Sequence, residues 1–390
     1  MKSTPLFLLL LILCCASVSR KIAREAPPVV TKLRIIQDEK AQTIAVFRAG
    51  GKTPILTQNA KADFRPYLHP IQAPDGKGVL TEYSPGHHKH QTGLYWGFTR
   101  VNGRDYFHHP QGDYWRRVSA KVLTAAGPEV KWETVYDLLD STGTAVLTET
   151  QTWAMREQGG KFLLDLEWNG EAKTDVTIGK YDYGGLFLRM PWKPGIPGEV
   201  INAARQRNEK AEGQRAMWVD VGMQVPGRDD LAHVAIFDHP ENKGYPQTWR
   251  VDGQLGIGPA RARSGAWTIK KGETETIRHE VVVYTGTLDD VALTKTWSEY
   301  SGVNSTGALW GIAQREGREA KFLTPDEAVK SMTMLPGFKA NVWASEPMMT
   351  QPMAFCWDDR GRLWVAENKD YESRGYGFSK AGNSRILILE

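Results

Sequence analysis

The sequence has 390 residues, of which 41% are hydrophobic and 24% are charged, with 38 glycines and 21 prolines. This composition is typical of a folded globular protein, and it excludes an intrinsically disordered chain, a collagen-like repeat and a protein with many membrane spans. The formal net charge is +4, and the basic residues are spread along the chain instead of forming a block. Nothing in the charge pattern therefore indicates nucleic-acid binding.

Residues 1–19 have the pattern of a secretory signal peptide. Lys2 precedes an apolar run at 6–13, and small residues follow up to Ser19, as they do before a cleavage site. The run is too short to cross a bilayer. We therefore expect a secreted or periplasmic protein without a membrane span in the mature chain, with envelope attachment through a lipidated cysteine of the leader as the alternative. Cleavage would leave Cys356 as the only cysteine, so we expect no internal disulfide bond.

From residue 30 to residue 286, short runs of alternating apolar and polar residues are separated by Gly, Pro, Asn and Asp. This period of two predicts antiparallel strands with one face in a core, and residues 162–168 are a clear example. Residues 140–143 read as a hairpin turn. We expect strands at 43–48, 94–98, 130–140, 144–155, 185–190, 216–221, 233–237 and 274–285. So many strands predict an all-β fold, a large antiparallel β-sandwich.

Helical patterns appear only after the last of these strands. Thr287 is placed to cap a helix over about 288–300. Thr324 is placed to cap a second helix, which would begin at Pro325 and complete a capping box with Glu327. We therefore expect a sandwich domain at 30–286, a helical linker at 287–334 and a further β unit at 335–390.

Six of the nine histidines lie between positions 69 and 109. Imidazole both binds transition metals and exchanges protons near neutral pH, so this clustering indicates a site. His88 and His90 would share one face of an extended segment and could supply two metal ligands, with a third from elsewhere in the fold. The alternative is a polar loop whose histidines only form hydrogen bonds with the backbone.

Other polar groups suit a ligand rich in hydroxyl groups. We expect His88 and His90 to act as acid or base opposite the carboxylate of Asp238. The expected substrate contacts are Arg65, His69, His87, Asn102, Arg189, Asp220, His239, Asn242 and Trp249. Each of these residues has an ordinary alternative role, in a turn, an ion pair or, for tryptophan, the core.

Several common catalytic motifs are missing from the sequence. It has no nucleotide-binding glycine motif after a strand, no G-x-S-x-G elbow, no H-E-x-x-H helix and no paired C-x-x-C. The sequence thus leaves the cofactor open, with a divalent metal on His88 and His90 as one candidate.

A series of short motifs between about residues 30 and 286 resembles the PmoA-like family of exported bacterial domains. In order, they are RPY at 65–67, GHH at 86–88, GLYWGF at 93–98, VNG at 101–103, GGLFLR at 184–189, WVD at 218–220, FDHPEN at 237–242 and then Trp249. The resemblance implies a galactose-mutarotase-like supersandwich, a fold that handles carbohydrates.

A second resemblance begins near residue 323. The motifs are LPGF at 335–338, ASEP at 344–347, QPMA at 351–354, DDRGRLWVAE at 358–367 and SRILIL at 384–389. They are similar to the opening of exported, membrane-bound dehydrogenase propellers related to soluble glucose dehydrogenases. The resemblance implies a truncated first propeller blade at 335–390, since a propeller needs several four-stranded blades.

These observations lead us to expect an exported domain that binds a carbohydrate, such as an oxidised sugar, and transforms it by acid-base chemistry between histidine and a carboxylate. Such an enzyme would be a hydrolase, lyase or isomerase. Three alternatives are a non-catalytic carbohydrate-binding module, a metal-dependent hydrolase or lyase, and a sugar dehydrogenase in the intact parent.

Overall fold

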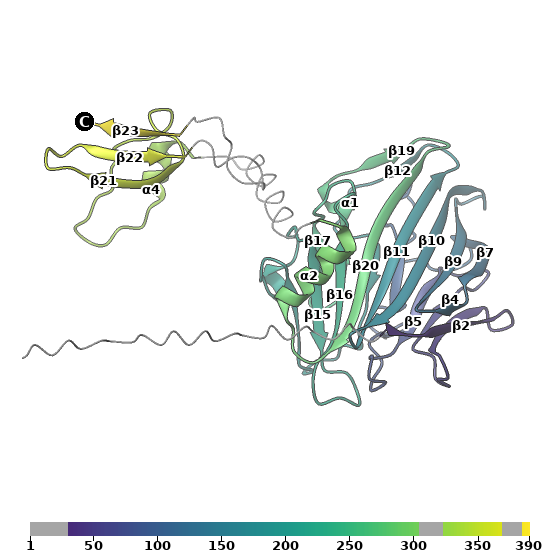
Figure 1. Cartoon of the computed structure of the whole chain (residues 1–390). Helices are drawn as coiled ribbons and strands as arrows, with labels where there is room; N and C mark the ends of the chain where they lie inside the picture. The colour runs from purple at the N-terminus through teal and green to yellow at the C-terminus, as the bar shows by residue number, and fades with distance from the viewer. Residues whose placement is uncertain (1–29, 304–322, 369–383) are drawn as a thin grey trace, which may run out of the picture.

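The computed structural model describes residues 30–303, 323–368 and 384–390, so the predicted signal peptide lies outside the described residues. Most of the strands belong to two antiparallel nine-stranded sheets that pack against each other (Figure 1). The predicted all-β sandwich is therefore confirmed. Within the described ranges, no helix has the length and apolar character needed to cross a membrane.

The first sheet is built from the longest strands of the chain. Its order is β14 (Gly198–Asn202), β15 (Trp218–Met223), β16 (Ala232–Asp238), β20 (Thr274–Thr285), β11 (Lys161–Ala172), β10 (Ala145–Gln158), β9 (Glu129–Leu139) and β7 (Trp115–Thr124), with β1 (Val30–Thr31) paired to β10. The turn between β9 and β10 is the predicted hairpin, and Gly143 has a φ of 80°, a conformation that favours glycine.

The second sheet consists of shorter strands. Its order is β17 (Trp249–Val251), β18 (Ile257–Pro259), β13 (Gly185–Leu188), β6 (Leu94–Gly97), β5 (Tyr67–Ile71), β4 (Leu56–Asn59), β3 (Thr43–Arg48), β2 (Leu33–Asp38) and β8 (Ala126–Gly127). The strands β12 (Val176–Ile178) and β19 (Trp267–Ile269) form a separate pair, and η1 (Asn208–Lys210) and α1 (Arg261–Ser264) are single turns.

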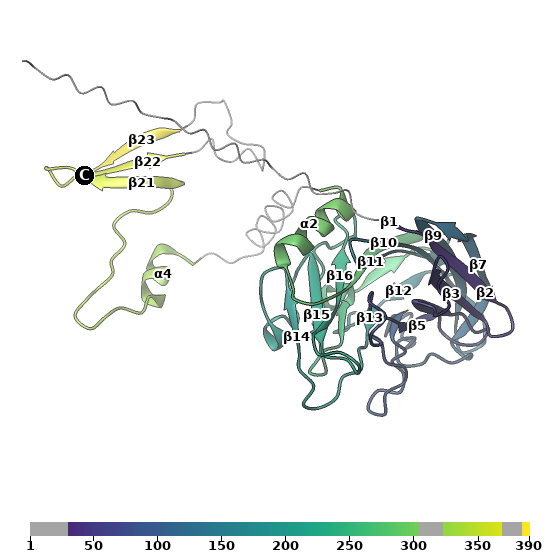
Figure 2. The same cartoon turned by 60° about the horizontal axis from the view of Figure 1, so that its bottom comes forward.

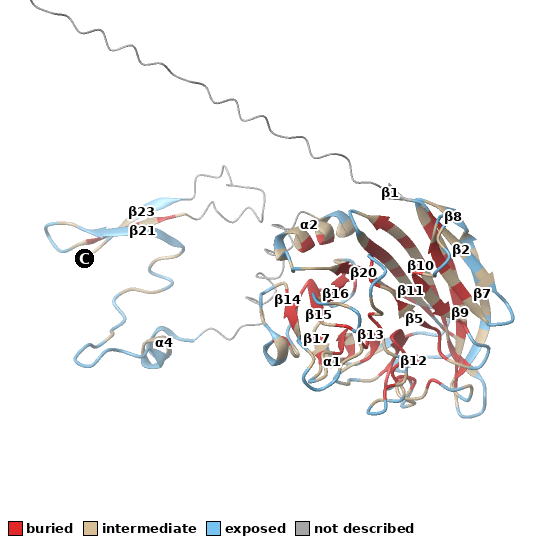
Figure 3. Ribbon diagram, turned by 90° about the horizontal axis from the view of Figure 1, so that it is seen from below, coloured by how far each residue is buried: buried red, intermediate tan, exposed pale blue. Residues whose placement is uncertain are grey.

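The core lies between the two sheets. Phe162, Leu164, Leu166 and Trp168 of β11 all point into it, as their alternation predicts. Figure 3 shows the same alternation as bands of buried residues along β10 and β11. Trp96 of the second sheet stacks on Trp168 of the first with 4.9 Å between ring centroids, so aromatic packing joins the layers.

The helix α2 (Asp290–Ser301) corrects the predicted linker at 287–334. It lies along the outer face of the first sheet beside β16 and β20 (Figure 2), and its Leu293 and Trp297 are buried in a second apolar cluster with Trp218 and Phe237. It is therefore packed as part of the sandwich domain.

The start of α2 also differs from the prediction. Asp289 is the N-cap in place of Thr287, because its carboxylate accepts hydrogen bonds from the backbone N–H groups of Val291 and Ala292.

A carboxylic acid is buried inside the sandwich. Glu149 of β10 is 1% exposed, and it accepts hydrogen bonds from Trp168 Nε1 at 3.0 Å and Gln151 Nε2 at 2.8 Å. Burial raises the pKa of Glu149 to about 7, because desolvation outweighs these hydrogen bonds and the charge of Arg65.

This carboxylic acid predicts a pH dependence of stability. The folded-state pKa of Glu149 lies above its ordinary value of 4.5, so the folded protein binds the proton more tightly than the unfolded chain. The free energy of unfolding should therefore fall by up to about 3 kcal/mol as the pH rises from 4.5 to 7. Urea titrations across this range should show the fall, and Glu149→Gln should abolish that part of it. An unchanged slope in the variant would contradict the assignment.

The C-terminal residues form a small unit of their own. The helix α4 (Pro325–Ser331) begins with the predicted Thr324–Glu327 capping box, which is confirmed. The strands β21 (Pro352–Trp357), β22 (Leu363–Glu367) and β23 (Arg385–Leu389) form an antiparallel sheet within the β unit expected at 335–390. That this sheet opens a propeller stays a prediction. Cys356 is an exposed free cysteine, and every residue of β21 is exposed.

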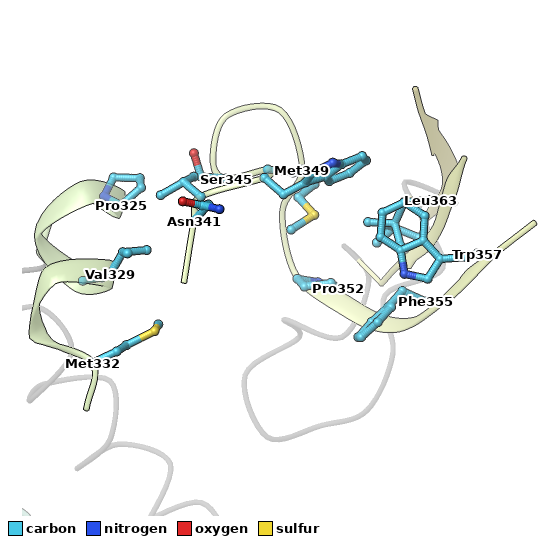
Figure 4. Close-up of a pocket in the computed structure, with 15 residues that line it drawn as sticks. Pro325, Val329, Met332, Asn341, Ser345, Met349, Pro352, Phe355, Trp357 and Leu363 are labelled. Atoms are coloured by element: carbon cyan, nitrogen blue, oxygen red, sulfur yellow. The ribbon is translucent and has the colours of Figure 1, made fainter. Parts of the chain in front are cut away.

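An apolar pocket lies between α4 and this sheet (Figure 4). Its lining includes Val329 and Met332 from α4, Phe355 and Trp357 from β21, and Trp343 from the segment between. The rings of Trp343 and Trp357 lie edge to face at 5.1 Å. This pocket has no titratable side chain in its lining, so it offers no group for proton transfer.

Candidate functional site

A second aromatic layer covers the outer face of the second sheet. Tyr67, Tyr95 and Phe187 come from β5, β6 and β13, and they alternate along these strands with core residues. Since successive strand residues point to opposite faces, these rings face away from the first sheet. Phe107 and Tyr183 pack on them from neighbouring loops.

A polar pocket opens above this layer. We name it the histidine pocket, and its lining consists of His88, His90, Gln91, Phe107, His108, Tyr183, Phe187, Arg250 and Asp252. The clustered histidines of the sequence thus meet residues that lie more than 70 positions further along the chain.

A chain of hydrogen bonds runs through His108. Its Nδ1 donates to the Asp105 carboxylate at 2.7 Å, and its Nε2 lies 3.2 Å from the Tyr183 hydroxyl. Burial alone would raise the pKa of Asp105, but hydrogen bonds from the side chain and backbone of His108 hold that pKa below its ordinary value. Because a carboxylate only accepts, Asp105 fixes the proton of a neutral His108 on Nδ1 and leaves Nε2 as the proton acceptor.

His90 stands next to this chain. Its ring centroid is 4.5 Å from that of His108 and 5.7 Å from that of His88. Burial is the main cause that lowers the pKa of His90 to about 3, and the electrostatic interactions with His108 and Arg65 act in the same direction. Burial also lowers the pKa of His88, with a contribution from Arg189. His90 is therefore a neutral imidazole and a weak base at physiological pH.

Arg65 ties together the two loops that carry these histidines. Its side chain is fully buried and donates to the carbonyl oxygens of Phe107 and His90, both at 2.6 Å. The guanidinium also lies 3.8 Å from the centre of the Tyr95 ring. Arg65 thus positions the pocket from below and does not line it, which corrects its predicted role as a substrate contact.

Arg189 supports the pocket from another side. It is fully buried, it pairs with Asp252 at 2.6 Å, and it donates to the carbonyl of Gln254 at 2.7 Å and to the side chain of Gln91. Asp252 also accepts from the backbone N–H groups of Gln254 and Gly256. The predicted contact residue Arg189 is therefore a support that fixes two lining residues, Gln91 and Asp252.

The structure does not place Asp238 in the histidine pocket. Asp238 is completely buried at the end of β16, where its two oxygens accept from Asn242 Nδ2 and from the backbone N–H of Gln247. Asn242 bonds in turn to the backbone of Arg278, and the ring of His239 packs against Tyr300 of α2. The predicted pairing of Asp238 with His88 and His90 is wrong. The side chains of the 238–242 segment instead bond to neighbouring backbone and pack against α2 at the end of β16.

Four other predicted contacts also have structural roles. Asp220 accepts from the buried His233 and Tyr284, and Trp249 is in the core and donates to the carbonyl of Ala216. Asn102 accepts a hydrogen bond from the backbone N–H of Thr177, in a distant segment of the chain. His69 bonds to Thr81. His87 is exposed and lies beside His88 and Trp192, near the pocket without being in its lining.

The metal hypothesis is not supported by the described residues. Among them, no three His, Cys, Asp or Glu side chains are grouped so that they could hold a metal ion. The His88 and His90 rings lie edge to face, and His108 beside them does not complete a group of three that could hold a metal ion. The residues present do not fit the predicted site.

The sequence analysis missed the residues that complete the pocket. Asp105 and His108 are three positions apart in a loop, and Tyr183, Arg250 and Asp252 come from distant segments. Asp105 and His108 lie directly after the VNG motif at 101–103. Their three-residue spacing beside this motif is the feature of the sequence that could have indicated them. The other three carry no local signal.

Two family models match the chain. A family of unknown function, DUF6807, matches residues 45–298, and a domain of unknown function, DUF7133, matches residues 324–390. The first match covers the sandwich from within β3 onward and most of α2. Among curated proteins, none matches this sequence.

Solved structures of sugar-processing enzymes resemble the sandwich at low identity. The GH36 α-galactosidase AgaB from Geobacillus stearothermophilus has a TM-score of 0.32 and 9% identity, with 65% of this chain and 41% of that chain covered. A GH36 α-galactosidase from the same organism in complex with stachyose has a TM-score of 0.36 and 9% identity, with 65% and 40% covered.

A galactose mutarotase related enzyme from Lactobacillus acidophilus has a TM-score of 0.30 and 8% identity, with 65% and 98% covered. This chain thus spans about two fifths of the length of the α-galactosidases. At these scores the likenesses say nothing about the chemistry of this chain.

Proposed function

The chain belongs to the DUF6807 family of unknown function, and from this premise we propose that the histidine pocket binds a carbohydrate, an oxidised sugar included, and transforms it by proton transfer. The observation that carries the proposal is the Asp105–His108–Tyr183 chain, which ends at the wall of a pocket that also holds a neutral imidazole. Polar groups above an aromatic layer suit a ligand with one apolar face and several hydroxyl groups.

His108 is the base in this proposal. Asp105 orients the ring, and Nε2 accepts a proton either from the Tyr183 hydroxyl or from a substrate hydroxyl that takes its place. His90 does not serve as the base, because its low pKa gives it little affinity for a proton. It holds a substrate oxygen instead, as a neutral donor or acceptor. This assignment replaces the predicted pair of His90 with Asp238.

The wider context is part of the same proposal. We propose that the domain is exported and PmoA-like, and that residues 335–390 open a dehydrogenase-like propeller. The support for both is the order of the short motifs in the sequence. A non-catalytic carbohydrate-binding module is the second candidate, and the aromatic rings in and beneath the pocket wall favour it.

Calorimetric titration with a panel of neutral and acidic sugars tests the site. We expect at least one sugar to bind, and we expect His88→Ala and His90→Ala each to weaken its binding by about tenfold, because each substitution removes a polar group that lines the pocket. His69→Ala is the matched control, since His69 bonds to Thr81 outside the pocket lining. If the two pocket variants bind every sugar as the wild type does, the site is wrong. Binding without turnover would favour the binding module.

A further inference from the structure

The charges around the histidine pocket do not cancel. Arg189 is paired with Asp252, whereas Arg250 and Arg263 both bond to the single carboxylate of Glu212, at 2.8 and 2.5 Å. Asp105 is the carboxylate that bonds to His108. Together with Arg65, the described residues around the pocket thus include four guanidinium groups and three carboxylates, which leaves one positive charge in excess.

The unmatched charge at the base of the pocket is that of Arg65. Its side chain is fully buried, and among the described residues it donates hydrogen bonds only to backbone carbonyl oxygens and to the hydroxyl of Thr92. Burying a cation without a carboxylate partner is costly. Glu149 and Asp105 interact with Arg65 only through space, and the raised pKa of Glu149 leaves that carboxyl group partly neutral near pH 7.

At the wall, Arg250 shares the carboxylate of Glu212 with Arg263 and so has no carboxylate of its own among the described residues. It lines the pocket, its side chain is 31% exposed, and within the described part of the chain its one hydrogen bond goes to the shared Glu212. A guanidinium has five N–H donors, so Arg250 retains donors for a ligand. Its planar fork matches a carboxylate in geometry as well as in charge.

Building on the proposed function, we infer that the ligand is a monoanionic sugar acid whose carboxylate binds Arg250 inside the histidine pocket. Four guanidinium groups and three carboxylates surround the pocket or support its lining, so one negative charge on the ligand balances the site. The neutral imidazoles of His88 and His90 remain available for hydroxyl groups of the sugar ring. With a neutral sugar, Arg250 would have only the carboxylate that it shares with Arg263.

The test is calorimetric titration of the full chain with D-glucuronate and D-galacturonate, beside D-glucose, D-galactose and acetate. We expect a uronate to bind about tenfold or more tightly than the matched neutral hexose, the effect of one charge-assisted hydrogen bond. Arg250→Met should remove this preference and Arg250→Lys should keep part of it. Arg207→Met, at an exposed arginine paired with Glu199, is the matched control and should leave binding unchanged.

The outcomes separate the two proposals. Equal binding of uronate and hexose, or a preference that survives in Arg250→Met, would overturn the sugar-acid inference alone. Acetate binding as tightly as uronate would show a simple anion site and would also overturn it. Failure of every sugar to bind would overturn the proposed function together with this inference.

Discussion

Replacing His108 by asparagine is expected to lower turnover of the sugar substrate by about 10²- to 10⁴-fold, the usual contribution of a positioned general base. Asparagine keeps a polar side chain of similar reach but cannot take up a proton at neutral pH. Asp105→Asn should act in the same direction, because an amide no longer fixes the imidazole proton on Nδ1. Steady-state rates at saturating sugar would measure both effects.

His87→Asn is the control for this experiment. His87 is an exposed imidazole next to His88, and it is absent from the pocket lining. Its replacement changes the same residue type in the same histidine cluster. It should leave the rate of sugar turnover within about twofold, because substitutions at exposed positions outside a site have small effects. Equal rates in wild type and His108→Asn would refute the role of His108 as base, whatever the control does.

Truncating Trp297 to alanine should lower the free energy of unfolding of the sandwich domain by about 3–5 kcal/mol. The indole is completely buried between α2 and the outer face of the first sheet, and its Nε1 donates to the carbonyl of Asp238 at 2.9 Å. The substitution removes a large apolar side chain and leaves that carbonyl without its donor. Urea denaturation followed by far-ultraviolet circular dichroism would measure the loss.

Val291→Ala is the matched control on the same helix. The Val291 side chain is 72% exposed, so its truncation should change stability by less than about 0.5 kcal/mol. If Trp297→Ala costs no more than this control, α2 is a dispensable linker, and the domain ends at β20 as the sequence analysis expected.

The strands could be predicted because their signal is local. Residues 43–48 and 274–285 were predicted with the bounds that β3 and β20 have, since alternation and flanking turns mark both ends. α2 was placed well along the chain but was wrongly assigned to a linker. Burial of Leu293 and Trp297 depends on a face of the sheet that no window of sequence contains.

The site was predicted only in part, for the same physical reason. His88 and His90 were found because histidines are rare and these two are only two positions apart in the sequence. Asp238 was chosen as a carboxylate next to a histidine, but a strand end buried under a helix uses such a carboxylate to bond its own backbone. Which carboxylate contacts which imidazole depends on how the loops pack over the second sheet. The spacing of residues along the sequence does not indicate this packing.

The hydrogen bonds of Arg65 limit how the loops around the histidine pocket can be altered. The guanidinium of Arg65 donates to a backbone carbonyl in each of the two histidine-bearing loops, so this one side chain links the loops. An insertion in either loop would shift one of these carbonyl groups and leave the buried guanidinium without that hydrogen-bond acceptor. Any attempt to graft new specificity here should therefore exchange both loops together, with the arginine retained as their common anchor.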